Sequence, residues 1–97
     1  MGREVMVHLP ERVWTTLVNL VMAPDGSSLP AAVRQRLRDA VETRSEPVPA
    51  ALRLVTLTRE DADVLESWLG ALCSRPDCPR DCRTALDLLR EGKRLSS

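Results

Sequence analysis

The order of periodic segments constrains this 97-residue chain most strongly, because a strand pattern followed by two helical patterns occurs twice. Residues 5–9 are apolar at every second position, as in a strand with one buried face, and residues 52–57 form a second strand candidate. A single strand would leave a row of backbone N–H and C=O groups unpaired. We therefore expect the two strands to pair antiparallel, with the helical segments covering the apolar face of this ribbon.

The first unit spans residues 4–43. Residues 13–21 carry a broad helical apolar face after Pro10, and turn-forming residues then interrupt the pattern. Ser28 is expected to cap a second helix. The apolar stripe of that helix repeats every four residues and comprises Leu29, Val33, Leu37 and Val41.

The second unit spans residues 52–92. It follows a linker, residues 44–51, whose two prolines favour an extended and stiff chain. Thr58 and Asp61 have the spacing of a capping box at a helix start. Gly92 is expected to end the last helix.

The two units align at a nearly constant offset, which favours an internal repeat. An offset of 48 residues brings Val7 onto Val55, and an offset of 49 brings Leu37 onto Leu86. The alternative is that any two such stretches of a leucine-rich chain would align this well. The repeat predicts a mainly α fold with a small two-stranded antiparallel β-ribbon, in which tandem β-α-α units pack as one compact domain over residues 1–97.

Charge is balanced both overall and locally. The chain has 14 Lys and Arg residues and 14 Asp and Glu residues, and residues 1–48 by themselves hold six of each kind. This balance excludes a basic arm and an acidic tail. It also excludes a half of the chain with the net positive charge that nucleic-acid binding favours. Residues with AT-rich codons are rare, which indicates a genome of high GC content, bacterial or phage.

Three features predict a cytoplasmic protein without a membrane partner. No apolar run approaches the roughly 18 residues of a membrane span, and the first residues do not form a signal-peptide pattern. The three cysteines are odd in number, whereas secreted disulfide scaffolds usually have an even count. We therefore expect a reducing compartment.

Cys73, Cys78 and Cys82 lie within ten residues of one another, and three interpretations remain open. Structural packing is favoured, because cysteine behaves as a small hydrophobe on an apolar helix face. One alternative is a disulfide that joins Cys73 to Cys78 or Cys82. The other is a zinc site completed by His8 or a nearby carboxylate.

The sequence contains no catalytic constellation. His8 is the one histidine, and it lies in the middle of a strand pattern without a nucleophile motif nearby. The four glycines are scattered, so they cannot form a phosphate-binding loop. We therefore expect no catalytic residue, no cofactor and no enzymatic activity.

The segment 7–11, Val-His-Leu-Pro-Glu, is followed by Leu17 and Leu20 and then by the helix expected after Ser28. On these residues, the chain resembles the ribbon–helix–helix family over residues 4–43, and the second unit resembles it more loosely. The resemblance implies a fused pseudo-dimer whose two strands form one shared ribbon. In that family the ribbon enters the DNA major groove, and its outward side chains read base edges.

The resemblance also implies which side chains face outward from the ribbon. The outward set would be Glu4, Met6, His8, Leu54 and Thr56. Arg53 would lie on the core side or at its rim. This set departs from a DNA reader, because Glu4 would repel phosphates and Met6 offers no hydrogen bond. DNA affinity depends on cations that neutralise phosphates, and the ribbon has almost none.

Two functions compete. Balanced charge, small size and missing catalytic groups favour a non-enzymatic protein-binding or regulatory module, such as a phage or accessory inhibitor, that binds a protein partner or forms a homodimer. The alternative is a ribbon–helix–helix-type DNA-binding regulator, whose salt-dependent duplex binding should be lost when His8 and Arg53 become Ala. The candidate interaction residues are Met6, His8, Arg34, Arg38, Arg53 and Thr56.

Overall fold

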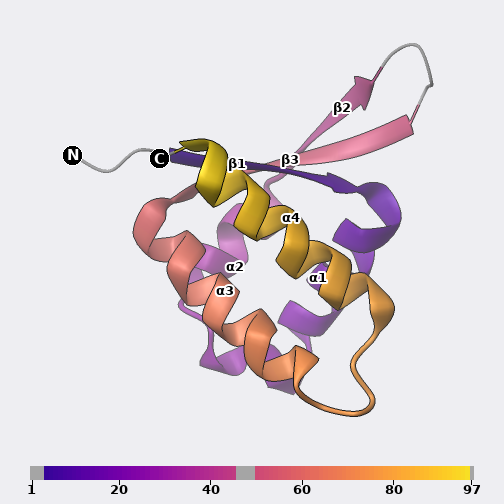
Figure 1. The fold of residues 1–97 in the computed structure, drawn as a ribbon, viewed down its shortest axis with the longest axis vertical. Helices are drawn as coiled ribbons and strands as arrows, with labels where there is room; N and C mark the ends of the chain where they lie inside the picture. The colour runs from indigo at the N-terminus through magenta and orange to yellow at the C-terminus, as the bar shows by residue number, and fades with distance from the viewer. Residues whose placement is uncertain (1–3, 46–49, 97) are drawn as a thin grey trace.

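Strands and helices are interleaved along the chain in the computed structural model, which describes residues 4–45 and 50–96 (Figure 1). In chain order the elements are β1 (Glu4–Pro10), α1 (Glu11–Met22), the 3-10 turn η1 (Pro24–Ser28), α2 (Ala31–Arg38), β2 (Val41–Ser45), β3 (Ala50–Thr58), α3 (Arg59–Cys73) and α4 (Arg80–Ser96). The described residues therefore form a mainly α domain with four α-helices and a small antiparallel sheet. At this level the sequence prediction is confirmed.

The sheet has three strands in the order β1-β3-β2. The prediction of a two-stranded ribbon is therefore wrong in the number of strands, because it omits β2. β3 is nine residues long. β1 pairs antiparallel with one of its edges, with Val7 opposite Val55, and β2 pairs antiparallel with the other. The extra strand follows from backbone chemistry, because the second edge of β3 would otherwise present unpaired N–H and C=O groups.

β2 occupies residues that the sequence pattern assigns to a helix and a linker. The helical stripe predicts a helix as far as Val41, but α2 ends at Arg38, and Val41 begins β2. Residues 44–45 and 50–51 of the expected linker belong to β2 and β3, whereas its two prolines lie outside the described residues. Valine and threonine, both present in β2, favour strands. Pairing with β3 here outweighs the helical spacing.

The helices begin in two different ways. α1 and α2 start directly after Pro10 and Pro30, whose φ angles are −53° and −58° and whose side chains make no capping hydrogen bond. The sequence predicts that Ser28 caps α2, and this prediction is wrong. Ser28 instead ends η1, and Pro30 precedes the helix. α3 starts after Thr58, whose hydroxyl oxygen accepts a hydrogen bond of 3.1 Å from the backbone N–H of Asp61. The predicted cap at Thr58 is thus confirmed.

Gly92 lies inside α4 rather than at its end, because α4 continues to Ser96. A Cβ atom at this position would lie 2.8 Å from the carbonyl oxygen of Met6 and 3.2 Å from a methyl group of Val7. Only glycine avoids these contacts without a shift of the neighbouring atoms. The prediction that Gly92 ends the helix is wrong, and the glycine instead allows α4 to pack directly against the backbone of β1.

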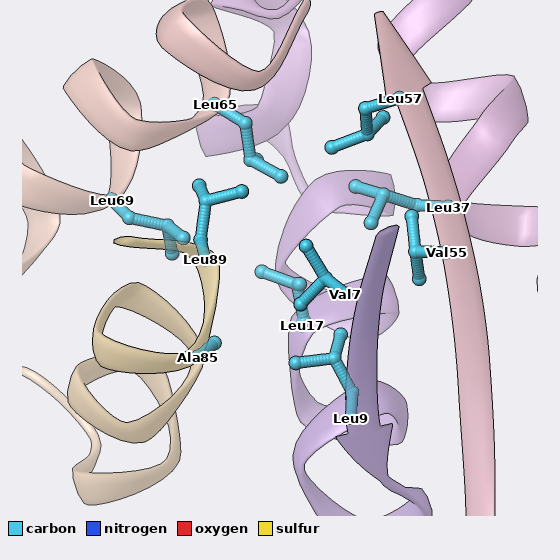
Figure 2. Close-up of a pocket in the computed structure, with 10 residues that line it drawn as sticks. All are labelled: Val7, Leu9, Leu17, Leu37, Val55, Leu57, Leu65, Leu69, Ala85 and Leu89. Carbon is cyan, nitrogen blue, oxygen red and sulfur yellow. The ribbon is translucent and has the colours of Figure 1, made fainter. Parts of the chain in front are cut away.

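One face of the sheet packs on the helices, and the β2–β3 hairpin extends away from them (Figure 1). The residues of the sheet that point toward the helices, each at most 3% exposed, are Val5, Val7, Leu9, Val55 and Leu57. Figure 2 shows four of these side chains directed toward Leu17, Leu37, Leu65, Leu69, Ala85 and Leu89 of the helices. The cavity between them is about 10 Å³, which is the lower limit for one water molecule, and its lining is aliphatic. It is therefore a packing gap rather than a ligand site.

Candidate functional site

The side of the sheet opposite the core, called the outer face below, is the candidate functional site. Because directly opposite residues in antiparallel strands project to the same side, the register defines its members. Among the residues whose side chains the structure describes, the register places on the outer face Glu4, Met6, His8, Pro10, Val41, Leu52, Leu54, Thr56 and Thr58. Leu54 lies between His8 of β1 and Val41 of β2, so these three form a row across all three strands.

Two large apolar side chains of the outer face are more than half exposed. Met6 is 55% exposed and Val41 is 64% exposed, and Leu54 between the strands is half-buried. Single apolar residues on a surface are ordinary, but neighbouring ones form a patch that water solvates poorly. The outer face therefore exposes an apolar side chain on each edge strand, with Leu54 of the central strand between them, and it contributes nothing to the buried core.

A groove of about 460 Å³ continues this patch toward α2. Its lining consists of Ala32, Gln35, Arg36, Asp39, Ala40, Val41, Leu54 and Thr56. The charged groups at its rim have partners: Arg36 donates a hydrogen bond of 3.4 Å to the carbonyl oxygen of Thr56 and lies 3.8 Å from a carboxylate oxygen of Asp61. The side chain of Gln35 donates to both carboxylate oxygens of Asp39 at 3.0 Å. The groove thus has apolar lining residues and a polar rim whose charged groups are hydrogen-bonded or ion-paired.

The outer face carries little charge of either sign. Among its described residues Glu4 is the one carboxylate, and none is Lys or Arg. His8 is exposed and lies opposite Leu54 rather than beside a nucleophile in the described part of the chain. This surface can bind a partner by apolar contact, but it lacks the cations that neutralise a phosphate backbone.

Arg53 lies on the inner side of β3, at the rim of the core, as the strand alternation predicts. Its guanidinium lies over the ring of Trp14, 4.5 Å from the ring centroid, and 3.3 Å and 3.8 Å from the carboxylates of Glu11 and Glu42. The indole N–H of Trp14 donates a hydrogen bond of 2.8 Å to the carbonyl oxygen of Leu37. Arg53 therefore joins β3 to α1 and β2, and the structure does not bring it to the outer face with Met6 and the other candidates.

Arg34 and Arg38 are also separate from the outer face. They are four residues apart on α2 and line a hollow of about 230 Å³ together with Met22, Ala31 and Gln35. Arg36, between them in sequence, lines the groove beside the outer face instead. Of the six candidate interaction residues, the structure therefore brings Met6, His8 and Thr56 together. Val41 belongs with them, and the helical interpretation of residues 29–41 is the reason that the sequence pattern missed it.

The three cysteines are unpaired and lie close to one another at the junction of α3 and α4. Cys82 is 1% exposed within the core, while Cys73 and Cys78 are half-buried and pack against that core. Burial raises the pKa of the Cys73 thiol, and its hydrogen bond with Cys78 raises it further. Burial likewise raises the pKa of Cys82 to about 11. Among the described residues no three His, Cys, Asp or Glu side chains form a group that could hold a metal ion.

Two further searches add no functional assignment. Within residues 4–45 and 50–96, no helix is both long and apolar enough to span a membrane. Comparisons with models of protein families, with curated proteins and with solved structures found no match. A function for this chain must therefore be argued from its residues and their geometry.

Proposed function

We propose that this chain is a non-enzymatic, regulatory protein-binding module that uses the outer face of its sheet. The observation that carries the proposal is the exposure of Met6 and Val41, at 55% and 64%, on one face with Leu54. Burying such side chains against a partner is favourable by about 25 cal/mol for each Å² of apolar surface. Within residues 4–45 and 50–96, both side chains remain more than half exposed and outside the buried core.

The surroundings of the patch support a protein partner. Protein interfaces combine an apolar centre with a polar rim, and charged residues are depleted at the centre. Met6, Leu54 and Val41 supply the centre, whereas Gln35 and the ion-paired Arg36 supply the rim. The partner is either another protein or a second copy of this chain, and both use the same surface.

A capture experiment with two matched double variants tests the proposal. Met6→Glu with Val41→Glu adds two negative charges to the outer face, while Met22→Glu with Leu95→Glu adds the same charge at apolar sites of 58% and 76% exposure elsewhere. The immobilised proteins are exposed to a lysate of the source organism, and self-association is measured by light scattering. We expect the first pair to weaken capture or self-association at least about tenfold, and the second pair to leave it unchanged. Equal behaviour of the two variants would contradict the proposal.

The alternative is a DNA-binding regulator of the ribbon–helix–helix type, and the strand register supports it. Val7 lies directly opposite Val55, the residue onto which the repeat offset of 48 brings it, and the same offset converts the pair Glu4–Thr58 into the pair Leu52–Pro10. Two fused protomers sharing one ribbon would have a register of this symmetry. A low-salt mobility-shift assay with the gene's own upstream duplex tests this function, which predicts binding that His8→Ala weakens. Without a shift at low salt, the DNA-binding function is excluded for that duplex.

A further inference from the structure

The strand β2 forms one edge of the sheet. Among residues 4–45 and 50–96, β3 is the one strand that pairs with it, so its second edge is open. The β2–β3 hairpin also extends away from the helices (Figure 1). An open edge presents N–H and C=O groups that can pair with another strand. We propose that β2 pairs antiparallel with β2 of a second copy of this chain, so that the two sheets join edge to edge.

Two carbonyl oxygens show how the backbone groups of β1 and β3 are directed. In an antiparallel ladder, residues that direct both backbone groups at the facing strand alternate with residues that direct both away. Met6 and Thr56 lie directly opposite each other. The carbonyl oxygen of Thr56 accepts a hydrogen bond from Arg36 of α2, and that of Met6 lies close to Gly92 of α4. Both residues therefore direct their backbone groups away from the β1–β3 ladder.

The same alternation continues along β3. Pro10 has no N–H, and it lies opposite Leu52, as expected for a pair that exchanges no bonds between β1 and β3. Leu52 and Leu54 therefore direct their backbone groups at β2, where they lie opposite Thr43 and Val41. Every second residue of β2 thus bonds to β3, and the residues between them direct their N–H and C=O groups at the open edge.

The residues that present these groups are Glu42 and Arg44, on either side of Thr43. An antiparallel pair of identical strands centred on Thr43 brings residue 42 of each copy opposite residue 44 of the other. Each of these pairs can exchange both of its N–H···O=C bonds. The register also brings an acidic residue opposite a basic one, which favours cross-strand pairing.

The order of charges in β2 selects this register and a second copy as the partner. A shift of one strand by two residues would also match the outward backbone groups, but it would bring Glu42 opposite Glu42 or Arg44 opposite Arg44. Like charges directly opposite each other are destabilising. Two five-residue strands bury less surface than a standard interface, so we expect a dissociation constant between about 1 μM and 1 mM. This inference concerns the edge of β2 and is independent of the proposed function of the outer face.

Analytical ultracentrifugation of the full chain, at up to about 1 mM protein, tests the pairing with exchanged charges. Glu42→Arg leaves two basic residues at the edge and Arg44→Glu leaves two acidic ones, so each variant alone should dimerise at least about tenfold more weakly than wild type. An equimolar mixture of the two variants restores opposite charges in both pairs and should form a heterodimer. The double variant Glu42→Arg with Arg44→Glu should dimerise like wild type. A thermal melt followed by circular dichroism shows whether each variant is folded.

Three results would overturn the proposal: a wild type that stays monomeric at about 1 mM, single variants that dimerise as wild type does, or folded variants whose mixture does not associate. If one variant fails to fold, the wild type and the other variant still decide the question. Met6→Glu separates this edge from the outer face, because Met6 lies on β1, at the opposite edge of the sheet. It should leave the dimer unchanged. Self-association that Met6→Glu weakens and the charge variants do not would belong to the outer face and would contradict the pairing of β2.

Discussion

The two faces of the β1–β3 pair differ sharply although the same strands build both. On the inner face Val7 and Leu57 are 3% and 0% exposed, whereas Met6, next to Val7 in sequence, is 55% exposed on the outer face. Both faces are rich in apolar side chains, but only one is covered by helices. Folding therefore accounts for the inner face, and the outer face needs a different explanation, for which we propose a partner.

The largest expected effect comes from truncating one leucine on each face of β3. Leu57→Ala removes a fully buried side chain and should lower the free energy of unfolding by about 2–5 kcal/mol, through lost burial and a residual cavity. Leu54→Ala, on the half-buried outer face, should cost about 1 kcal/mol or less. Urea denaturation of both variants measures the difference. Similar losses would show that the outer face is packed within the monomer, and the comparison of the two faces would then fail.

The next effect concerns how tightly a helix covers the sheet. Gly92→Ala places a Cβ atom 2.8 Å from the carbonyl oxygen of Met6, so the free energy of unfolding should fall by about 1–3 kcal/mol. Gly70→Ala is the matched control in α3, because outside the adjacent residues and the nearby backbone of its own helix no described atom lies within 4 Å of the added Cβ. There the better helix propensity of alanine should stabilise the protein by up to about 1 kcal/mol. Thermal and urea denaturation should show changes of opposite sign.

A smaller effect should separate Arg53 from the outer face. Arg53→Met keeps the aliphatic stem but removes the cation over Trp14 and the contacts with Glu11 and Glu42, and it should cost about 1–2 kcal/mol of unfolding free energy. Arg53→Lys should restore little of this, because an ammonium cannot stack as a planar guanidinium does. Partner capture by the folded variant should be unchanged. Weaker capture without lower stability would place Arg53 in the binding surface.

The sequence predicts the inner face well and the sheet incompletely. Alternation over residues 5–9 identifies Val5, Val7 and Leu9 as buried, because a strand's side-chain period is a local property. The third strand is not local. Val41 fits the four-residue spacing of a helix, and only the unpaired edge of β3 gives residues 41–45 a reason to be extended.

The candidate site is predictable to a similar extent. The family resemblance implies that Met6, His8 and Thr56 face outward, and the strand register places them on the outer face. The role of Val41 depends on β2, so the sequence could not supply it. The stacking of Arg53 on Trp14 depends on how α1 crosses β3, and neither residue carries a motif that would reveal the contact.

The smallest effect lies between two helices and concerns neither face of the sheet. Lys93 of α4 forms ion pairs with Asp63 and Glu66 of α3, the latter at 3.0 Å. The hydrogen bond with Lys93 lowers the pKa of Asp63, and the hydrogen bond with Asp63 is the main cause that raises the pKa of Lys93. A lowered carboxyl pKa contributes stability that is lost as pH falls through it, and a raised amine pKa contributes stability that is lost as pH rises through it. The difference in melting temperature between wild type and Lys93→Gln should therefore be greatest near neutral pH and shrink toward both extremes. Lys93→Arg keeps the positive charge, so near neutral pH its melting temperature should lie closer to that of the wild type than to that of Lys93→Gln. A difference between wild type and Lys93→Gln that does not change with pH would show that Lys93 acts through packing instead.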